Sequence, residues 1–182
     1  MKPILFSTSM VQAILEGRKT VTRRPIKPQP DRFFEVNAYP VYLYDVEWGI
    51  DRIYPRYNVD EVIYARETWA YQFGLYWHKA GSFPADTTPP DKWRPSIHMP
   101  REAARLFLRV GSVWAERLQD ITGEQAIAEG FAPLVDVLTG AVAVSAREIF
   151  QAEWDNIYAA KGYGWEDKPW VFAYKFGRVE RS

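Results

Sequence analysis

The chain contains no cysteine and only two histidines, His78 and His98. Disulfides and thiolate metal sites are therefore excluded, and a histidine-based metal site has little to build on. The absence of cysteine suits a cytoplasmic protein, which is the localisation we expect. No apolar run approaches the about 20 residues of a membrane span, and no signal peptide opens the sequence. We therefore expect no membrane partner.

The sequence also lacks an excess of charge of either sign. It has 23 Lys and Arg against 23 Asp and Glu, so its formal net charge is zero. No global field draws such a protein to nucleic acid, and any contact with phosphates must come from a local patch. Aromatic residues are abundant, at 16% with eight tryptophans. They indicate either a core filled with large side chains or a surface on which bases stack.

Alternating and helical patterns of apolar residues predict a mixed α+β protein. Strands are expected at residues 3–7, 20–24, 61–66, 106–116 and 170–176, with a further strand within 39–48. Helices are expected after the capping patterns that begin at Ser9, Thr122 and Ser145. Because the strands are scattered through the chain without a regular βαβ order, we expect one domain over residues 1–182, with a mixed sheet or small barrel and a few helices. Residues 25–58 and 70–97 read as two long insertions.

The densest polar cluster follows Gly17, which is well placed to end the first helix in the left-handed conformation. It consists of Arg18, Lys19, Thr20, Thr22, Arg23 and Arg24. Four cations within seven residues form a local positive patch, for which phosphate is the natural partner. The alternative is a solvated edge strand whose charges prevent aggregation. The pattern alone leaves both open.

The segment GRKTVTRR resembles the G-R-K-T-x-T-x-R signature of ASCH domains. The segment EVIYARETW resembles a V-R-E-T-W block of a larger subgroup that is common in phages and prophages. Three later segments, RPSIHMPREAARLFL, ERLQDITGEQAIAEGF and GYGWEDKPWVFAYKF, are similar to the pattern of the same subgroup. The resemblance implies a PUA-like fold, which is a small mixed β-barrel flanked by a few helices, with the two long insertions added.

The resemblance also implies a site. Relatives in this family are amidohydrolases that remove the acetyl group from N4-acetylcytidine with a lysine, a threonine and a glutamate. Those positions fall on Lys19, Thr22 and Glu129. A lysine whose pKa is lowered could activate the threonine hydroxyl, and the glutamate could protonate the leaving amine. The plainer interpretation is an ordinary strand residue at Thr22 and a surface residue at Glu129.

Further candidates lie near the R-E-T-W block. Glu67 is either a pocket acid or the partner of an internal cation such as Arg24 or Arg101. Trp69 is expected to stack a base or to pack in the core, and His98 to be structural or catalytic. The full set expected to bind ligand is Arg18, Arg23, Arg24, Arg66, Trp69 and His98.

Three functions remain open from the sequence. The chain could hydrolyse N4-acylated cytidine, read RNA without chemistry as a PUA-like module, or cut RNA as a ribonuclease, and it could be phage-derived. Its expected partner is RNA or a modified nucleoside or nucleotide. No motif for a metal or an organic cofactor is visible. The sequence departs from the family at Asn58-Val59-Asp60-Glu61, where many members have a Gly-Asp pair, and it gives no indication of oligomeric state.

Overall fold

A five-stranded mixed sheet is the centre of the fold in the computed structural model, which describes residues 1–30, 35–36, 42–45, 51–83 and 87–180. The strand order is β1-β6-β9-β12-β2. The strands are β1 (Pro3–Leu5), β2 (Val21–Pro25), β6 (Val62–Arg66), β9 (Phe107–Arg117) and β12 (Trp170–Val179). The four strands other than β1 each contain two or more β-branched or aromatic residues, which fit a pleated, half-buried surface.

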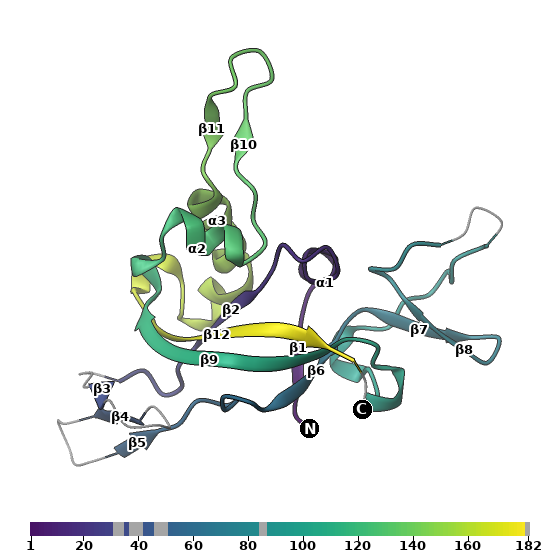
Figure 1. Ribbon diagram of the computed structural model, residues 1–182, viewed down its shortest axis with the longest axis horizontal. Coiled ribbons are helices and arrows are strands. Elements are labelled where there is room, and N and C mark those ends of the chain that lie inside the picture. Colours follow the sequence, from purple (N-terminus) through teal and green to yellow (C-terminus); the bar gives the residue numbers. More distant parts are fainter. Residues whose placement is uncertain (31–34, 37–41, 46–50, 84–86, 181–182) are drawn as a thin grey trace.

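The long antiparallel pair β9–β12 carries the sheet (Figure 1). Strand β2 pairs antiparallel with β12, β6 pairs antiparallel with β9, and β1 pairs parallel with β6. Among the described residues no ladder joins the two outer strands, β1 and β2. The expected α+β class with a multi-stranded mixed sheet and few helices is confirmed, whereas the described strands form no closed barrel.

Three α-helices accompany the sheet: α1 (Thr8–Leu15), α2 (Gly123–Ala128) and α3 (Ala146–Tyr158). Thr122 and Ser145 cap α2 and α3 in full capping boxes, as the sequence predicts. The prediction for α1 was two residues late, because the side chain of Ser7, rather than that of Ser9, accepts from the backbone of Met10. Short 3₁₀ turns lie at Ser96–His98, Arg101–Ala103, Leu118–Asp120, Ala159–Lys161 and Trp165–Asp167.

Small hairpins and sheets extend from this body. The first insertion holds β3 (Glu35–Val36), β4 (Tyr42–Asp45) and β5 (Asp51–Ile53), and the rest of the strand expected at 39–48 lies outside the described residues. The second insertion holds the hairpin of β7 (Trp69–Gln72) and β8 (Leu75–His78). Figure 1 shows a further arm, β10 (Leu134–Val135) and β11 (Val142–Val144), which the sequence analysis did not predict.

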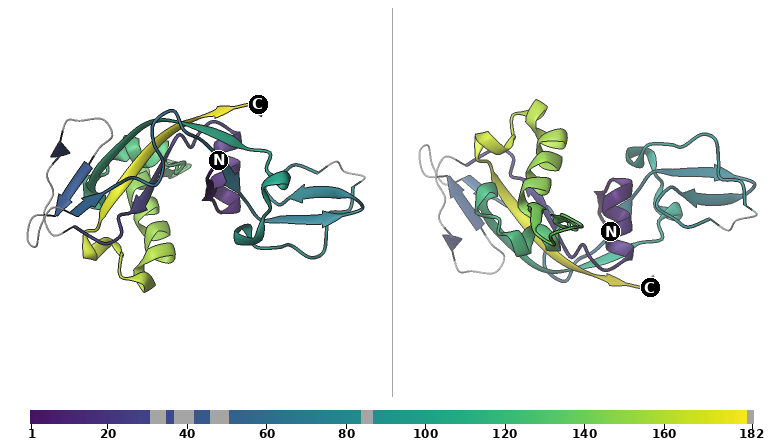
Figure 2. Two further views of the ribbon diagram at one scale, coloured as in Figure 1. Left: turned by 90° about the horizontal axis from the view of Figure 1, so that it is seen from below. Right: turned by 90° about the horizontal axis from the view of Figure 1, so that it is seen from above.

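The helices and the hairpin of the second insertion occupy different parts of the molecule. Figures 1 and 2 show α2 and α3 together near one end of the sheet and β7–β8 at the other end. One apolar core lies between the sheet and α1, and a second lies under α2 and α3 around Phe150 and Trp154. Within the described residues, no helix has the length and apolarity needed to cross a bilayer.

Candidate functional site

The turn after α1 carries Lys19 into the interior. Gly17 has φ 77°, a left-handed conformation that glycine adopts without strain. The backbone N–H groups of Arg18 and Lys19 then both donate to the carbonyl of Ala13, which closes the helix end. The chain is therefore still turning at Lys19, and strand β2 begins only at Val21.

The end of helix α2 meets this turn. Lys19 and Glu129 form an isolated antiparallel bridge, and Gly130 follows with φ 98°. A Cβ at Gly130 would lie 2.9 Å from the Cβ of Ala13 and 3.1 Å from the Cβ of Lys19. Glycine is therefore required at position 130 for two reasons: it adopts the left-handed backbone conformation, and it leaves room for the close approach that places Glu129 beside Lys19.

Lys19 and Glu129 form a buried ion pair, one part of a larger network. Lys19 Nζ donates to Glu129 Oε2 at 2.5 Å and to the Glu129 carbonyl at 2.9 Å. Arg23 Nη1 donates to the other carboxylate oxygen of Glu129 at 3.1 Å, and Arg23 Nε donates to Glu116 Oε1 at 2.6 Å. The Trp114 indole completes the network by donating to Glu116 Oε2. Two cations and two carboxylates thus balance each other in the interior.

Burial sets the electrostatics of Lys19. The side chain has no exposed surface, and this desolvation lowers the pKa of Lys19 below its usual value of 10.5. The carboxylate of Glu129 opposes that shift, whereas the nearby guanidinium groups of Arg24 and Arg23 reinforce it. Both side-chain oxygens of Glu129 already accept hydrogen bonds from cations, one from Lys19 and the other from Arg23.

Thr22 lies apart from this network. Thr22 and Arg23 are neighbours on β2, so their side chains point to opposite faces of the sheet. The hydroxyl of Thr22 accepts from Arg24 Nη1 at 2.8 Å and makes no hydrogen bond with Lys19 or Glu129 among the described residues. The structure therefore joins two of the three residues of the implied hydrolase site directly, whereas the third, Thr22, is bonded to Arg24.

The basic patch expected at residues 18–24 is largely neutralised within the protein. Arg18 pairs with Glu16 at the surface, and the side chains of Lys19 and Arg23 are buried against carboxylates. Of the four cations in this patch, Arg24 alone has no carboxylate partner among the described residues. Its guanidinium donates to the carbonyls of Leu5 and Arg23 as well as to Thr22.

The residues of the R-E-T-W block are held by internal contacts. Glu67 is 1% exposed and receives a bidentate pair from Arg105, at 2.9 and 3.0 Å, rather than from Arg24 or Arg101. Trp69 is packed in a core with Met99 and neighbouring residues, and its buried indole N–H has no partner among the described residues. Trp69 therefore offers no free face on which a base could stack.

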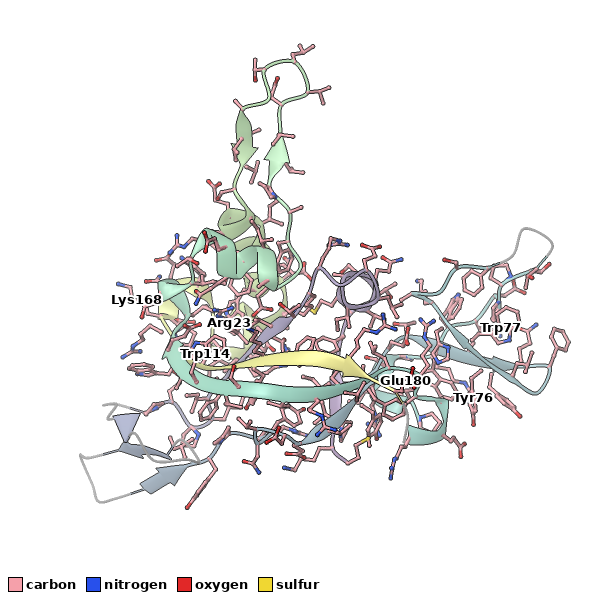
Figure 3. The ribbon with its side chains drawn as sticks, in the orientation of Figure 1. Arg23, Tyr76, Trp77, Trp114, Lys168 and Glu180 are labelled. Atoms are coloured by element: carbon pink, nitrogen blue, oxygen red, sulfur yellow. The ribbon has the colours of Figure 1, made fainter. Side chains whose placement is uncertain are left out.

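Arg66 and His98 lie nearer the surface. Arg66 Nη1 donates to the carbonyl of Ile97, while its Nε is buried without a partner among the described residues. The side chain of His98 is exposed in a 3₁₀ turn. Figure 3 shows Arg23 near the α2 end of the sheet and Tyr76 on the distant β7–β8 hairpin. The predicted residues therefore fall into separate groups rather than a single cluster.

A large cleft opens beside β1, β2 and the end of α3. Its volume is about 900 Å³, and segments that are far apart in the sequence line it. Among the described lining residues there is no Asp or Glu. The lining contains five cations, Arg24, Lys27, Arg56, Arg66 and Lys161, and six aromatic residues, Phe6, Tyr54, Tyr57, Tyr158, Phe172 and Tyr174.

Each of the five cations lies over an aromatic ring, and none of them forms a salt bridge among the described residues. The distances from cation to ring centroid are 5.4 Å for Arg24 over Phe6, 4.8 Å for Lys27 over Tyr163, 5.7 Å for Arg56 over Tyr57, 5.8 Å for Arg66 over Tyr64 and 5.3 Å for Lys161 over Tyr158. A ring positions a cation without neutralising it. The cleft therefore keeps a local positive charge on a protein whose net charge is zero.

Two tyrosines form a rigid wall of the cleft. The rings of Tyr57 and Tyr174 meet edge to face with centroids 5.2 Å apart. The Tyr57 hydroxyl donates to the carbonyl of Pro3, and the Tyr174 hydroxyl accepts from the backbone of Arg56. Burial raises the pKa of Tyr57, and it raises the pKa of Tyr174 to about 12, so both phenols stay neutral at physiological pH.

A small inner pocket continues from the cleft. Met10, Arg24, Ile157 and Tyr158 line both spaces. The inner pocket has a volume of about 20 Å³, and its other walls include Arg23, Glu129, Glu153 and the rings of Phe131, Phe150 and Trp154. Lys19 and Thr22 line neither space. Among the described residues, no group of three or more His, Asp or Glu side chains could hold a metal ion.

Sequence reasoning missed most of the cleft. Lys27, Arg56 and Lys161 were not candidates, because they lie in three segments that share no motif. Two local signals were present: Arg56 directly precedes Tyr57, and Lys161 follows Tyr158 by three residues, where it donates to the end of α3. Neither signal indicates which of the chain's many aromatic and basic residues share a cleft.

No protein-family model matches the chain, and no curated protein matches it. A solved structure that resembles it is the crystal structure of protein EF3133 from Enterococcus faecalis, described with the family model DUF984. The similarity covers 99% of this chain and 82% of that chain, with a TM-score of 0.47 and 10% sequence identity. A likeness this distant does not assign the chain to a family, and any function must be argued from the residues of the site.

Proposed function

We propose that this chain is a PUA-like, ASCH-type protein that binds RNA or a nucleotide in the large cleft, through phosphate contacts and base stacking. The observation that carries the proposal is the set of five cleft cations that lie over aromatic rings and lack carboxylate partners among the described residues. A phosphate-bearing ligand supplies the negative charge that the cleft itself does not.

The same arrangement explains how a neutral protein can bind a polyanion. Some cations elsewhere in the described residues are neutralised by carboxylates, as Arg23 is by Glu116 and Glu129 and Arg105 is by Glu67. In the cleft, the cations lie against aromatic rings instead of carboxylates. The positive potential is therefore local and is confined to a concave surface. Field lines focus in such a space, which raises the local concentration of an anionic ligand.

The aromatic lining supports a nucleic acid over a simple anion. Tyr54 is 52% exposed and lines the cleft, where it offers a ring to a base, whereas Tyr57 and Phe172 line the same space as buried residues. Every base has a π-face, and stacking on an aromatic side chain contributes about 1–3 kcal/mol per base. A single-stranded or mononucleotide ligand is favoured, because a duplex keeps its bases stacked on each other.

The proposal is tested by binding of a fluorescent single-stranded RNA at low salt, followed by anisotropy. Arg56→Gln and Lys161→Gln each remove one cleft cation whose side chain is exposed. Lys175→Gln is the matched control, because Lys175 is exposed on β12 outside the cleft. We expect each cleft variant to weaken binding about three- to tenfold and the control to leave it unchanged, since a charge-assisted contact is worth about 1 kcal/mol or more.

Two outcomes contradict the proposal. One is the absence of binding by the wild-type protein at low salt to both the RNA and mononucleotides. The other is equal weakening in Lys175→Gln and the cleft variants, which would indicate non-specific attraction rather than a cleft.

The 2.5 Å contact between Lys19 and Glu129 favours a second candidate, an amidohydrolase of N4-acylated cytidine. The lowered pKa of Lys19 is what a lysine base requires. Against it, Thr22 makes no hydrogen bond with either residue among the described residues, and the side chains of Lys19 and Glu129 are almost completely buried. We therefore rank hydrolysis below binding.

Release of acetate from N4-acetylcytidine tests this second candidate. If it is right, the wild-type protein releases acetate and Lys19→Met abolishes the release while Lys175→Gln does not. A wild-type protein that binds the nucleoside but releases no acetate is a binding protein only.

A further inference from the structure

The inner pocket holds a buried donor that the protein does not use. Arg23 has no exposed side-chain surface, its Nε and Nη1 are paired with Glu116 and Glu129, and its Nη2 has no hydrogen-bond partner among the described residues. A buried donor without an acceptor is costly, so buried donors in folded proteins are nearly always paired. Because Arg23 lines the inner pocket, an acceptor that enters this pocket can satisfy Nη2.

A carboxylate of the protein, that of Glu153, also lines the inner pocket. Glu153 is half-buried on α3, and its carboxylate makes no hydrogen bond or ion pair among the described residues. The inner pocket thus presents a guanidinium N–H and a carboxylate that do not contact each other. A ligand group with one acceptor and one N–H donor side by side would pair with both.

Shape and charge restrict that ligand group. The space of about 20 Å³ admits a water molecule or the edge of a ring, but not a whole base. Phe131, Phe150 and Trp154 form a continuous aromatic wall, with centroids 5.8 and 5.9 Å apart along the series. The carboxylates of Glu129 and Glu153 oppose a phosphate. A flat, neutral, polar edge therefore fits better than an anion.

We propose that the inner pocket takes the edge of a nucleobase that carries an exocyclic amino group. Glu153 accepts from the amino group, and Arg23 Nη2 donates to the neighbouring ring nitrogen. Carboxylates pair with the amino group of cytosine in this manner in known nucleic-acid complexes. The inference rests on the proposed function, since the base reaches the inner pocket only when its phosphate and sugar occupy the large cleft.

Cytidine and uridine monophosphates test the inference, because their bases differ at this edge in an amino group against a carbonyl and in an accepting against a donating ring nitrogen. Binding of each is measured by calorimetry to the wild-type protein, to Glu153→Ala and to the control Glu166→Gln, whose side chain is exposed outside the pocket. We expect the wild type and the control to prefer cytidine monophosphate about tenfold. We expect Glu153→Ala to reduce that ratio clearly below tenfold while it still binds uridine monophosphate, and Arg23 to retain the part of the preference that comes from the ring nitrogen.

The ratio of the two nucleotide affinities within each variant controls for misfolding, because misfolding would weaken the binding of both nucleotides equally. A wild-type protein that binds both nucleotides equally, or a Glu153→Ala variant that keeps the tenfold preference, overturns the assignment of the inner pocket and leaves the cleft intact. A wild-type protein that binds neither nucleotide nor RNA overturns the proposed function and this inference together.

Discussion

Removal of the Glu129 carboxylate is expected to destabilise the protein strongly. Glu129→Ala leaves Lys19 without its ion-pair partner and Arg23 with Glu116 alone, and both cations have no exposed side-chain surface. An uncompensated charge in a buried pair costs about 3–5 kcal/mol. A chain of this size loses about 2–4 °C of melting temperature per kcal/mol, so a fall of about 6–20 °C is expected.

The assay is urea unfolding followed by circular dichroism, with Glu124→Ala as the control. Glu124 belongs to the same helix, but its side chain is exposed, so its removal costs at most about 1 kcal/mol from the helix dipole. A double variant, Lys19→Met with Glu129→Leu, removes both charges of the pair. We expect it to be more stable than Glu129→Leu alone, because no buried lysine charge is then left unpaired.

An equal cost for Glu129→Ala and Glu124→Ala would refute this reasoning. It would mean that water reaches Lys19 and Arg23 readily in solution. The ion pair of Lys19 and Glu129 would then be a solvated one. The conclusion that Lys19 is chiefly a structural residue would then fail, and the hydrolase candidate would gain weight.

Two further predictions concern groups outside this pair. The pKa of Tyr174 rises from 10.0 to about 12 on folding, so its neutral form stabilises the fold fully below pH 10 and this contribution is lost as the pH rises towards 12. At about 1.4 kcal/mol per pKa unit, the full loss is about 2.8 kcal/mol, and alkaline unfolding curves of Tyr174→Phe should lack this loss. Identical curves for both proteins would contradict the assignment. Arg105→Ala leaves Glu67 buried without its bidentate partner and should cost about 3 kcal/mol in urea unfolding. A cost below about 0.5 kcal/mol, typical of a surface substitution, would mean that solvent reaches Glu67.

Local patterns predicted the secondary structure well where the signal was strong. The capping boxes at Thr122 and Ser145 and the strand β12 are confirmed, because caps and periodicity act over a few residues. The half-buried alternation expected within β12 is not, since Val171–Tyr174 are all buried. The start of α1 was less certain, since Ser7 and Ser9 both offer a capping hydroxyl. The β10–β11 arm was missed because its two strands are only two and three residues long.

The sequence was less informative about the site. It identified Lys19 and Glu129 as neighbours through a resemblance and anticipated the turn at Gly17, yet the contact also depends on the close approach at Gly130, which spacing alone does not reveal. It placed Thr22 with them, although the alternation of β2 turns Thr22 to the other face. It treated residues 18–24 as a charged surface, because the partners Glu116 and Glu129 lie about one hundred residues away.

The salt dependence of RNA binding tests most directly whether the cleft contacts phosphates. The logarithm of the affinity of the wild-type protein for a single-stranded RNA should fall linearly with the logarithm of salt concentration, and each phosphate contact adds about 0.7 to the magnitude of the slope. We predict that replacing Lys27, Arg56 and Lys161 together by glutamine reduces this magnitude by about 2. A slope that the triple substitution leaves unchanged would contradict the claim that these cleft cations contact phosphate.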